Sequence, residues 1–229
     1  MTTIIAQLSD PHIRVGPDDT GSAAALTAAV EAVLALDPLP DAVLVSGDLA
    51  EGGTAAEYDR VRKLLAPLPM PVHVLPGNHD ALDWDGPYAA DCGDLRLVAC
   101  DTTKPGEDDG RLDLDWLEAQ LALSDAPAIV AMHHPPLLTG IGGLDAIGLP
   151  QSHREALAAL LARTPHVRRV VAGHVHRAVF TTLGGCAVMT CPSTNLQARL
   201  EIGSPGLTLV PEPPAFLVHT ANVAHVQPV

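Results

Sequence analysis

Short apolar runs rich in β-branched residues alternate with helical segments through the first three quarters of the chain. This alternation predicts an α/β fold, because a strand followed by a helix returns the chain to start a parallel neighbouring strand. The pattern predicts strands at 4–8, 42–46, 72–75, 95–100, 128–132 and 167–172, and helices at 21–37, 54–66, 113–123 and 152–163. Thr54 and Glu57 have the spacing of a capping box at the start of the second helix.

The helical pattern stops after residue 176. Short apolar runs joined by Gly and Pro turns follow, and they predict strands at 179–182, 187–191, 207–210, 216–220 and 223–226. We therefore expect an antiparallel section at the end of the chain. Two packed sheets flanked by helices, within one domain spanning residues 1–229, satisfy this order of elements.

Polar side chains of the metal-binding type follow five of the predicted strands. The segments are Asp10-Pro11-His12, Gly47-Asp48, Gly77-Asn78-His79-Asp80, His133-His134 and Gly173-His174-Val175-His176. Any one of them alone is typical of a turn or a cap. In α/β sheets, however, binding groups gather where the carboxyl ends of the strands meet. Five such segments in succession predict one rim of the sheets lined with oxygen and nitrogen ligands.

Composition excludes several classes of function. The formal net charge of −14 argues against a nucleic-acid groove or an anionic membrane surface. Aromatic residues make up only 3%, so bases have few surfaces on which to stack. No apolar run is long enough to span a bilayer. The four cysteines form no C-x-x-C pair, and no basic leader precedes the first strand, so we expect reduced thiols in a cytoplasmic protein.

Seven side chains are candidate metal ligands: Asp10, His12, Asp48, Asn78, His133, His174 and His176. None is a thiolate, and such a set suits Mn, Fe, Co or Zn in an open centre rather than a closed structural zinc site. Two ions about 3.5–4 Å apart can share a hydroxide and clamp an in-line displacement at phosphorus. Their charge would hold a small phosphate ester despite the acidic surface.

His79 is the candidate catalytic side chain outside the ligand set. It follows Asn78 and precedes Asp80. A histidine held by a carboxylate can protonate a leaving alkoxide or stabilise its developing charge. We therefore expect His79 and Asp80 to act together.

Taken as a set, these segments resemble the pattern of the calcineurin-like metallophosphoesterase superfamily: Asp-x-His, Gly-Asp, Gly-Asn-His, a His, and Gly-His-x-His. The resemblance runs from Asp10 to His176. It implies a four-layer αββα sandwich of two mixed β-sheets flanked by helices. It also implies one metal ion held by Asp10, His12, Asp48 and His176, and another held by Asp48, Asn78, His133 and His174.

The resemblance also separates the two neighbouring histidines at 133–134. The family ligand usually lies two residues before a proline, here Pro135, which favours His133 as the ligand. His134 would then support the site without touching the metal.

Within the superfamily, the chain looks most like the bacterial class III cyclic nucleotide phosphodiesterases. The stretches that carry this likeness are 76–80, 115–117, 132–136, 192–195 and 214–219. Glu51 departs from the pattern, which often has a second Asp there. The likeness implies hydrolysis of a small phosphodiester, first of all 3′,5′-cyclic AMP, by a hydroxide that bridges two Mn or Fe ions, with Zn or Co as alternatives. The family often forms dimers, so a homodimer is among the expected states.

Other functions stay open. The same centre would serve a glycerophosphodiesterase, a broad phosphodiesterase or phosphomonoesterase, or, with catalysis lost, a scaffold protein. Phosphoprotein phosphatases of the superfamily usually carry Arg before Gly-Asn-His, where this chain has Pro76. The loop at 137–150 is open between a pocket wall or lid, an oligomer contact and a plain surface loop. The segment 192–197 is expected near the site, and Arg177 either meets a phosphate or is solvated.

Overall fold

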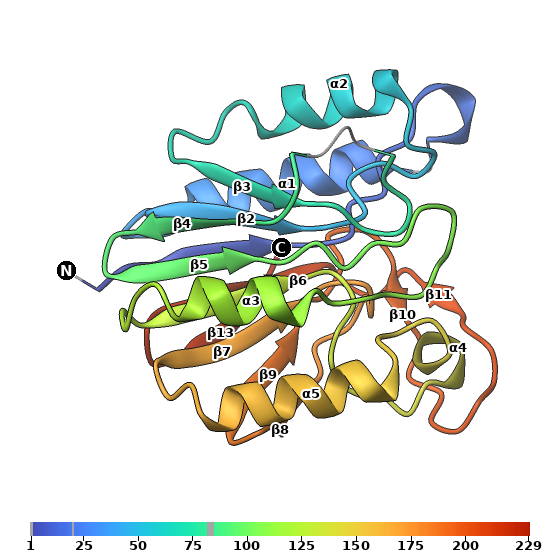
Figure 1. Ribbon diagram of the computed structural model, residues 1–229. Coiled ribbons are helices and arrows are strands. Elements are labelled where there is room, and N and C mark those ends of the chain that lie inside the picture. Colours follow the sequence, from blue (N-terminus) through green and yellow to red (C-terminus); the bar gives the residue numbers. More distant parts are fainter. Residues whose placement is uncertain (1, 20, 82–84) are drawn as a thin grey trace.

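Two β-sheets pack face to face with helices on both outer faces, as the computed structural model of residues 2–19, 21–81 and 85–229 shows (Figure 1). The five-stranded sheet has the order β13 (Ala224–Pro228), β12 (Ala215–His219), β1 (Ile5–Leu8), β2 (Ala42–Ser46), β3 (Val72–Leu75). The six-stranded sheet has the order β4 (Tyr88–Cys92), β5 (Leu95–Ala99), β6 (Ala128–Met132), β7 (Val167–Ala172), β9 (Cys186–Thr190), β8 (Phe180–Leu183). Both sheets are mixed, as predicted.

The side-chain alternation of the strands creates three apolar layers. Ile5 of β1 and Leu44 of β2 belong to the core between the two sheets, whereas Leu8 and Val45 pack under the outer helices. A third core lies on the outer face of the second sheet. Successive residues of a strand point to opposite faces, so a strand buried on both faces is apolar throughout. Three cores between four layers confirm the predicted αββα sandwich.

Helices α1 (Ser22–Leu34) and α2 (Ala55–Leu65) cover the first sheet, and α3 (Leu114–Leu121) and α5 (Gln151–Ala162) cover the second (Figure 1). The capping box of Thr54 and Glu57 is present. Helix α1 ends at Leu34, before the predicted residue 37. Pro38 disfavours the helical conformation of Asp37, which precedes it. No helix in the described part of the chain is long and apolar enough to cross a bilayer.

Two short helices and two strands were not predicted. They are η1 (Gly16–Asp18), α4 (Gly142–Asp145), the edge strand β4 and the two-residue strand β10 (Gln197–Ala198). Strand β4 reads Tyr-Ala-Ala-Asp-Cys, and its half-buried residues at the edge of the sheet lack the β-branched pattern of a central strand. Asp83, for which the sequence predicts a solvated loop charge, lies outside the described residues.

The end of the chain is antiparallel only in part. Strands β12 and β13 pair antiparallel as expected, but β9 runs parallel to β7. The chain leaves β7 and enters the sheet again at its edge as β8, so the turn after β8 sends β9 back between them. A small hairpin of β10 (Gln197–Ala198) and β11 (Leu209–Val210) precedes β12.

All five polar segments follow the strands that were predicted to carry them, namely β1, β2, β3, β6 and β7. Strands β1, β2 and β3 are parallel neighbours, and so are β6 and β7. Their carboxyl ends therefore bring the segments of each sheet to a common edge.

The core between the sheets also contains polar side chains. Gln7 of β1, Arg169 of β7 and His219 of β12 are each at most 3% exposed. Arg169 donates to the backbone carbonyls of Ala221 and Val223 at 3.1 and 2.7 Å. Burial, and then the charge of Arg169, lowers the pKa of His219 to about 3. His219 is therefore neutral in the folded protein at neutral pH.

We expect His219 to make the protein less stable in mild acid. In the unfolded chain the ring takes up a proton near pH 6.5, but in the folded chain only near pH 3. The unfolded state thus binds more protons between these values, and stability falls as the pH falls through that window. At pH 5 the loss is about 2 kcal/mol.

Urea unfolding of the metal-free protein at pH 7 and pH 5 measures this effect. His219→Gln should show a smaller loss of stability between the two pH values than the wild type. His225→Gln is the matched control, because His225 is exposed. An equal loss in wild type and His219→Gln would contradict the prediction.

Candidate metal centre

The two carboxylates of the predicted ligand set lie at the ends of β1 and β2. Asp10 is fully buried, and its oxygens accept from the Ser9 hydroxyl at 2.5 Å and from the His174 backbone N–H at 3.0 Å. Asp48 Oδ2 lies 3.4 Å from His12 Nε2 and 3.5 Å from His133 Nε2. This oxygen thus stands between histidines of the two expected ligand groups, which is the position of a shared ligand.

The backbone is strained at most of the predicted ligands. Five non-glycine residues in the described ranges have a positive φ, between 45° and 66°: Asp10, His12, Asp48, His174 and His176. A left-handed conformation costs such residues about 1–3 kcal/mol each and persists only where the surroundings impose it. Such strain gathers at functional sites, and here it coincides with five of the seven candidates.

Three imidazoles are held with one nitrogen turned to the centre. Their Nδ1–H groups donate to fixed acceptors: His12 to the Glu51 carboxylate (2.8 Å), His133 to the Ser46 carbonyl (2.9 Å) and His176 to the Leu196 carbonyl (2.8 Å). These acceptors carry no proton, so in the neutral rings Nε2 keeps its lone pair. Metal-binding histidines are oriented in the same way, through a hydrogen bond of the second ring nitrogen.

The Nε2 atoms of His12 and His176 are only 3.0 Å apart. Asp10, His12, Asp48 and His176 offer ligand atoms that all lie within 4.8 Å of one another. Two lone pairs that face each other at this distance repel unless a cation lies between them. The predicted first ligand group is thus brought together with the donors that a metal ion needs.

The second predicted group meets around the Asn78 amide. Asn78 Oδ1 is 3.1 Å from His133 Nε2 and 3.1 Å from His174 Nδ1. The other nitrogen of the His174 ring, Nε2, is buried without a hydrogen-bond partner. A buried polar atom without a partner costs about 1–3 kcal/mol. Its presence beside other donors fits a site built for a ligand.

His134 has no ring nitrogen left for a metal. Its Nδ1 is 3.0 Å from the Thr102 hydroxyl, and its Nε2 is 3.0 Å from the Asp108 carbonyl. Burial, and then the charge of His133, lowers the pKa of His134 to about 3, so the ring is neutral. One nitrogen donates to the carbonyl and the other accepts from the hydroxyl. This arrangement favours His133 over His134 as the ligand.

The charges at the centre call for a cation. Burial alone would lower the pKa of His133, but the Asp48 and Asp10 carboxylates raise it to about 9. Burial would also raise the pKa of Asp48, yet His133, His12 and His79 hold it well below its usual range. The buried Asp48 carboxylate therefore stays ionised and attracts positive charge. The donor atoms and the field both fit two metal ions.

His79 stands at the open side of this centre. Its ring is exposed, lies edge-on to the His12 ring with centroids 4.8 Å apart, and has Nδ1 3.2 Å from the Glu51 carbonyl. Its backbone N–H donates to Asp48 Oδ1 at 3.0 Å. The ring thus lies beside the first expected ligand group, and the backbone of His79 contacts Asp48, which both expected groups share.

The expected hydrogen bond between His79 and Asp80 is not formed, because Asp80 has other partners. The Asp80 carboxylate turns back and accepts from the backbone N–H groups of Leu49, Ala50 and Gly77 at 2.9–3.1 Å, and from the Tyr58 hydroxyl at 3.2 Å. Four donors outcompete one exposed imidazole. Asp80 therefore joins the loops that carry Asp48 and Asn78.

Glu51 is not among the predicted ligands, but its carboxylate orients one of them. Its carboxylate accepts from His12 on one side and from the Arg14 guanidinium at 2.6 Å on the other. The hydrogen bond from His12, and then the charges around it, lower the pKa of Glu51. In the sequence, only its position three residues after Asp48 pointed to a role of Glu51 at the site.

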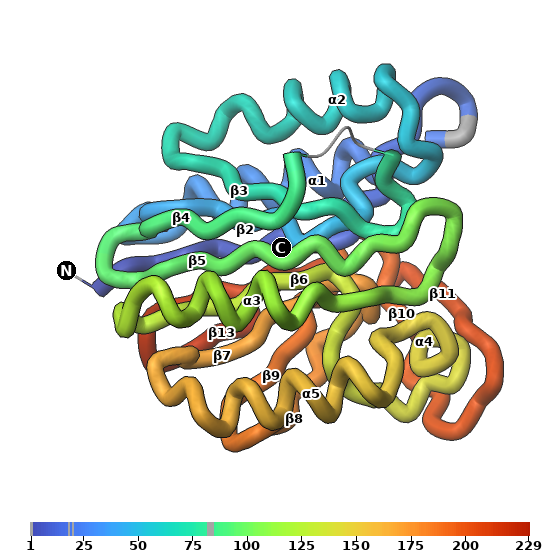
Figure 2. Tube along the Cα trace, in the orientation of Figure 1, coloured from blue at the N-terminus to red at the C-terminus, as the bar shows by residue number. Residues whose placement is uncertain are grey.

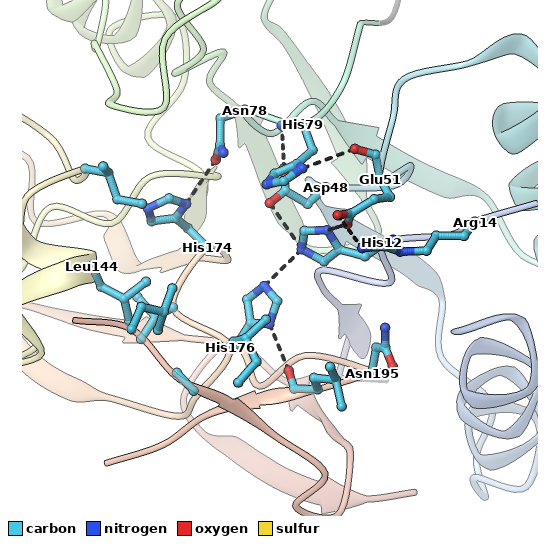
Figure 3. A pocket seen from close by; sticks show the side chains of 16 residues that line it. His12, Arg14, Asp48, Glu51, Asn78, His79, Leu144, His174, His176 and Asn195 are labelled. Carbon is cyan, nitrogen blue, oxygen red and sulfur yellow. Dashed lines mark hydrogen bonds and ion pairs between the residues drawn. The ribbon is translucent and has the colours of Figure 1, made fainter. Parts of the chain in front are cut away.

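The centre opens into a pocket with two unlike sides (Figure 3). One side is polar, with Arg14, Glu51, Asn78 and His79 around the histidines. The other side is apolar and is formed by Leu144, Ile147, Val175, Leu207 and Leu209. The loop at 137–150 is therefore a pocket wall, and Asn195 and Leu196 border the site as expected. Arg177 instead pairs with Glu212 and the Ala198 carbonyl.

A metal-dependent hydrolase is the class of protein that this fold and centre define. The chain belongs to the calcineurin-like phosphoesterase family, whose model matches residues 3–178. The predicted resemblance is thus confirmed, and the protein is a dimetal phosphoesterase.

Known relatives cover most of the chain. A protein of Synechococcus sp. named a probable cyclic nucleotide phosphodiesterase is 33% identical, over 93% of this chain and 89% of its own. The glycerophosphodiester phosphodiesterase GpdQ of Enterobacter lignolyticus is 34% identical, over 83% and 77%. A dimetal phosphatase structure from Danio rerio superposes with a TM-score of 0.69 at 16% identity, covering 99% and 98%, which shows the shared fold.

Proposed function

We propose that the protein hydrolyses a small phosphodiester, and that its substrate is 3′,5′-cyclic AMP. The observation that carries this proposal is the apolar wall of the same pocket into which the metal centre opens. A phosphate bound at the centre would place the rest of the substrate against Leu144 and Leu207. A purine offers a flat apolar face to such a wall, whereas a glycerol group offers hydroxyls. The Synechococcus relative supports this choice.

The wall is anchored to the centre. The backbone of Gly142 donates to the Ser204 carbonyl, and that of Gly203 donates to the Gly140 carbonyl, at 2.8 Å each. Helix α4 therefore lies beside the loop that leads to β11 (Figure 2). Ala198 donates to the His176 carbonyl at 3.1 Å. The apolar side of the pocket thus has a fixed position relative to a predicted ligand.

The protein's own side chains supply the positioning. When bound, the two metal ions supply charge stabilisation and a nucleophile that is active at neutral pH. Asp10, Asp48, Asn78 and the four candidate histidine ligands would hold this charge at the inner end of the pocket. We propose that the exposed ring of His79 gives a proton to the leaving oxygen; the backbone contact of His79 with Asp48 supports this by keeping the residue beside the centre. We propose Mn or Fe as the metals, with Zn or Co as alternatives, because the donors are oxygen and nitrogen.

A glycerophosphodiesterase is the second candidate, since GpdQ is a relative at similar identity. The two candidate substrates differ in the group that would lie against the apolar wall, which is a purine in cyclic AMP and a glycerol group in a glycerophosphodiester. We expect Leu207→Ser to lower kcat/KM for cyclic AMP about fivefold, by loss of about 1 kcal/mol of apolar contact. Glycerophosphoethanolamine turnover should not change.

Leu200→Ser is the matched control, because Leu200 is also exposed but does not line the pocket. Steady-state kinetics on both diesters and on a phosphomonoester measure the outcome. A wild-type preference for the glycerophosphodiester, or an equal effect of Leu207→Ser on both diesters, would sink the cyclic AMP assignment. A strong preference for the monoester would sink the diesterase function itself.

We also propose that the protein works in the cytoplasm. All four cysteines are free and buried. Reducing compartments keep cysteines in this state.

A further inference from the structure

A chain of buried side-chain hydrogen bonds ends on the carboxylate of Asp10. The successive contacts are Arg169 Nη1 to His219 Nδ1 (3.4 Å), His219 Nε2 to Gln7 Oε1 (2.9 Å), Gln7 Nε2 to Ser46 Oγ (2.9 Å), Ser46 Oγ to Ser9 Oγ (2.7 Å) and Ser9 Oγ to Asp10 Oδ2 (2.5 Å). Every member is at most 3% exposed. Solvent therefore does not compete for these bonds.

The residues at the two ends of this series of hydrogen bonds fix the direction in which its members donate. Arginine can only donate and a carboxylate can only accept. His219 Nδ1 therefore accepts from Arg169, and its proton is on Nε2, which donates to Gln7. Gln7 Nε2 also donates to the Ala172 carbonyl at 3.2 Å, which fixes the orientation of its amide. Each bond thus points from Arg169 toward Asp10, and aligned hydrogen bonds strengthen one another.

The series of hydrogen bonds also joins the two sheets at the metal centre. Gln7, Ser46 and His219 belong to the first sheet, whereas Arg169 and Ala172 belong to β7 of the second. The sheets approach closely there, since a Cβ on Gly173 would lie 2.4 Å from Ser9 Oγ. The predicted ligands come from both sheets, so their convergence depends on how the sheets register.

Stability alone does not explain this arrangement. Arg169 has no carboxylate among its hydrogen-bond partners in the described residues; its partners are two backbone carbonyls and His219. Burying a charge without a counter-ion is costly, and an apolar core of the same volume is usually at least as stable. The aliphatic core that surrounds the chain, which includes Ile5, Leu44 and Leu217, shows what would otherwise fill this space.

We propose that Arg169, His219, Gln7, Ser46 and Ser9 form a positioning relay that fixes the Asp10 carboxylate and the register of the two sheets for metal binding. These residues are positioning residues and touch neither substrate nor metal. The inference rests on the proposed metal function of Asp10. Similar supporting contacts change metal affinity about 10–100-fold when removed.

The test is titration of the metal-free protein with Mn²⁺, with free ion counted by electron paramagnetic resonance. We expect His219→Phe and Ser46→Ala to weaken Mn²⁺ binding about tenfold or more. His219→Gln should restore it to within about threefold, because an amide keeps both a donor and an acceptor. Should His219→Phe fail to fold, Ser46→Ala, which removes a single hydroxyl, decides the question.

Leu217→Ala is the matched control, since Leu217 is buried in the same layer but makes no bond in the relay. It should lower the unfolding midpoint while Mn²⁺ affinity stays within about twofold. Normal binding by the wild type with unchanged binding by Ser46→Ala and His219→Phe would overturn the relay alone. A wild-type protein that binds no Mn²⁺ would overturn the proposed metal centre, and the relay with it.

Discussion

Replacing Asp48 by asparagine is expected to lower kcat/KM for the phosphodiester about 1,000-fold or more. The change keeps the shape of the side chain and the oxygen that accepts from His79, but it removes the negative charge between His12 and His133. A shared ligand affects both metal positions at once. A loss of about 4 kcal/mol corresponds to this factor in rate.

Metal analysis after reconstitution with Mn²⁺ should show the cause of that loss. We expect two ions in the wild type and one or fewer in Asp48→Asn. Asp91→Asn is the matched control, because the Asp91 side chain is 80% exposed on the edge strand β4. An Asp48→Asn protein with full metal content and activity within tenfold of wild type would rule out the shared-ligand role.

Replacing His79 by alanine is expected to lower kcat about 100-fold, within the range of general acid catalysis. The metal content should stay at two ions, because the His79 contact with Asp48 comes from the backbone and survives the change. The exposed ring also makes folding insensitive to its removal. Turnover measured together with metal content therefore separates proton transfer from metal binding.

The leaving group sharpens this experiment. A p-nitrophenolate leaves without protonation, whereas the alkoxide of a ribose needs a proton. His79→Ala should therefore impair cyclic AMP hydrolysis far more than hydrolysis of a p-nitrophenyl phosphodiester. An equal loss on both substrates would show that His79 does not act as the acid, and unchanged turnover on both would remove it from the mechanism.

The position of the site could be predicted because it depends on local patterns. An apolar run that ends in Asp or His places this residue at the carboxyl end of a strand, and parallel strands share that edge. Asp10, Asp48 and His133 were found in this way. The parallel pairing of β9 with β7 was not predicted. It depends on where the β8–β9 hairpin joins the sheet, and no local sequence pattern encodes that position.

The contacts that orient the ligands could not be read from the chain. His12 and Glu51 are 39 residues apart, and His219 and Gln7 are 212 apart. Their pairing results from sheet packing alone. The error at Asp80 has the same origin, since sequence adjacency to His79 suggested a bond that three backbone N–H groups prevent.

The positive φ angles at Asp10, His12, Asp48, His174 and His176 restrict which residue types these positions readily accept. Among residues other than glycine, Asn, Asp and His are the ones enriched in that backbone conformation. The same three side chains bind Mn, Fe and Zn through oxygen and nitrogen, whereas soft metals such as Cu(I) need sulfur. A cysteine at one of these positions would thus be disfavoured by the backbone conformation itself, independently of the metal. The backbone of the rim therefore favours residues with oxygen and nitrogen donors over cysteine.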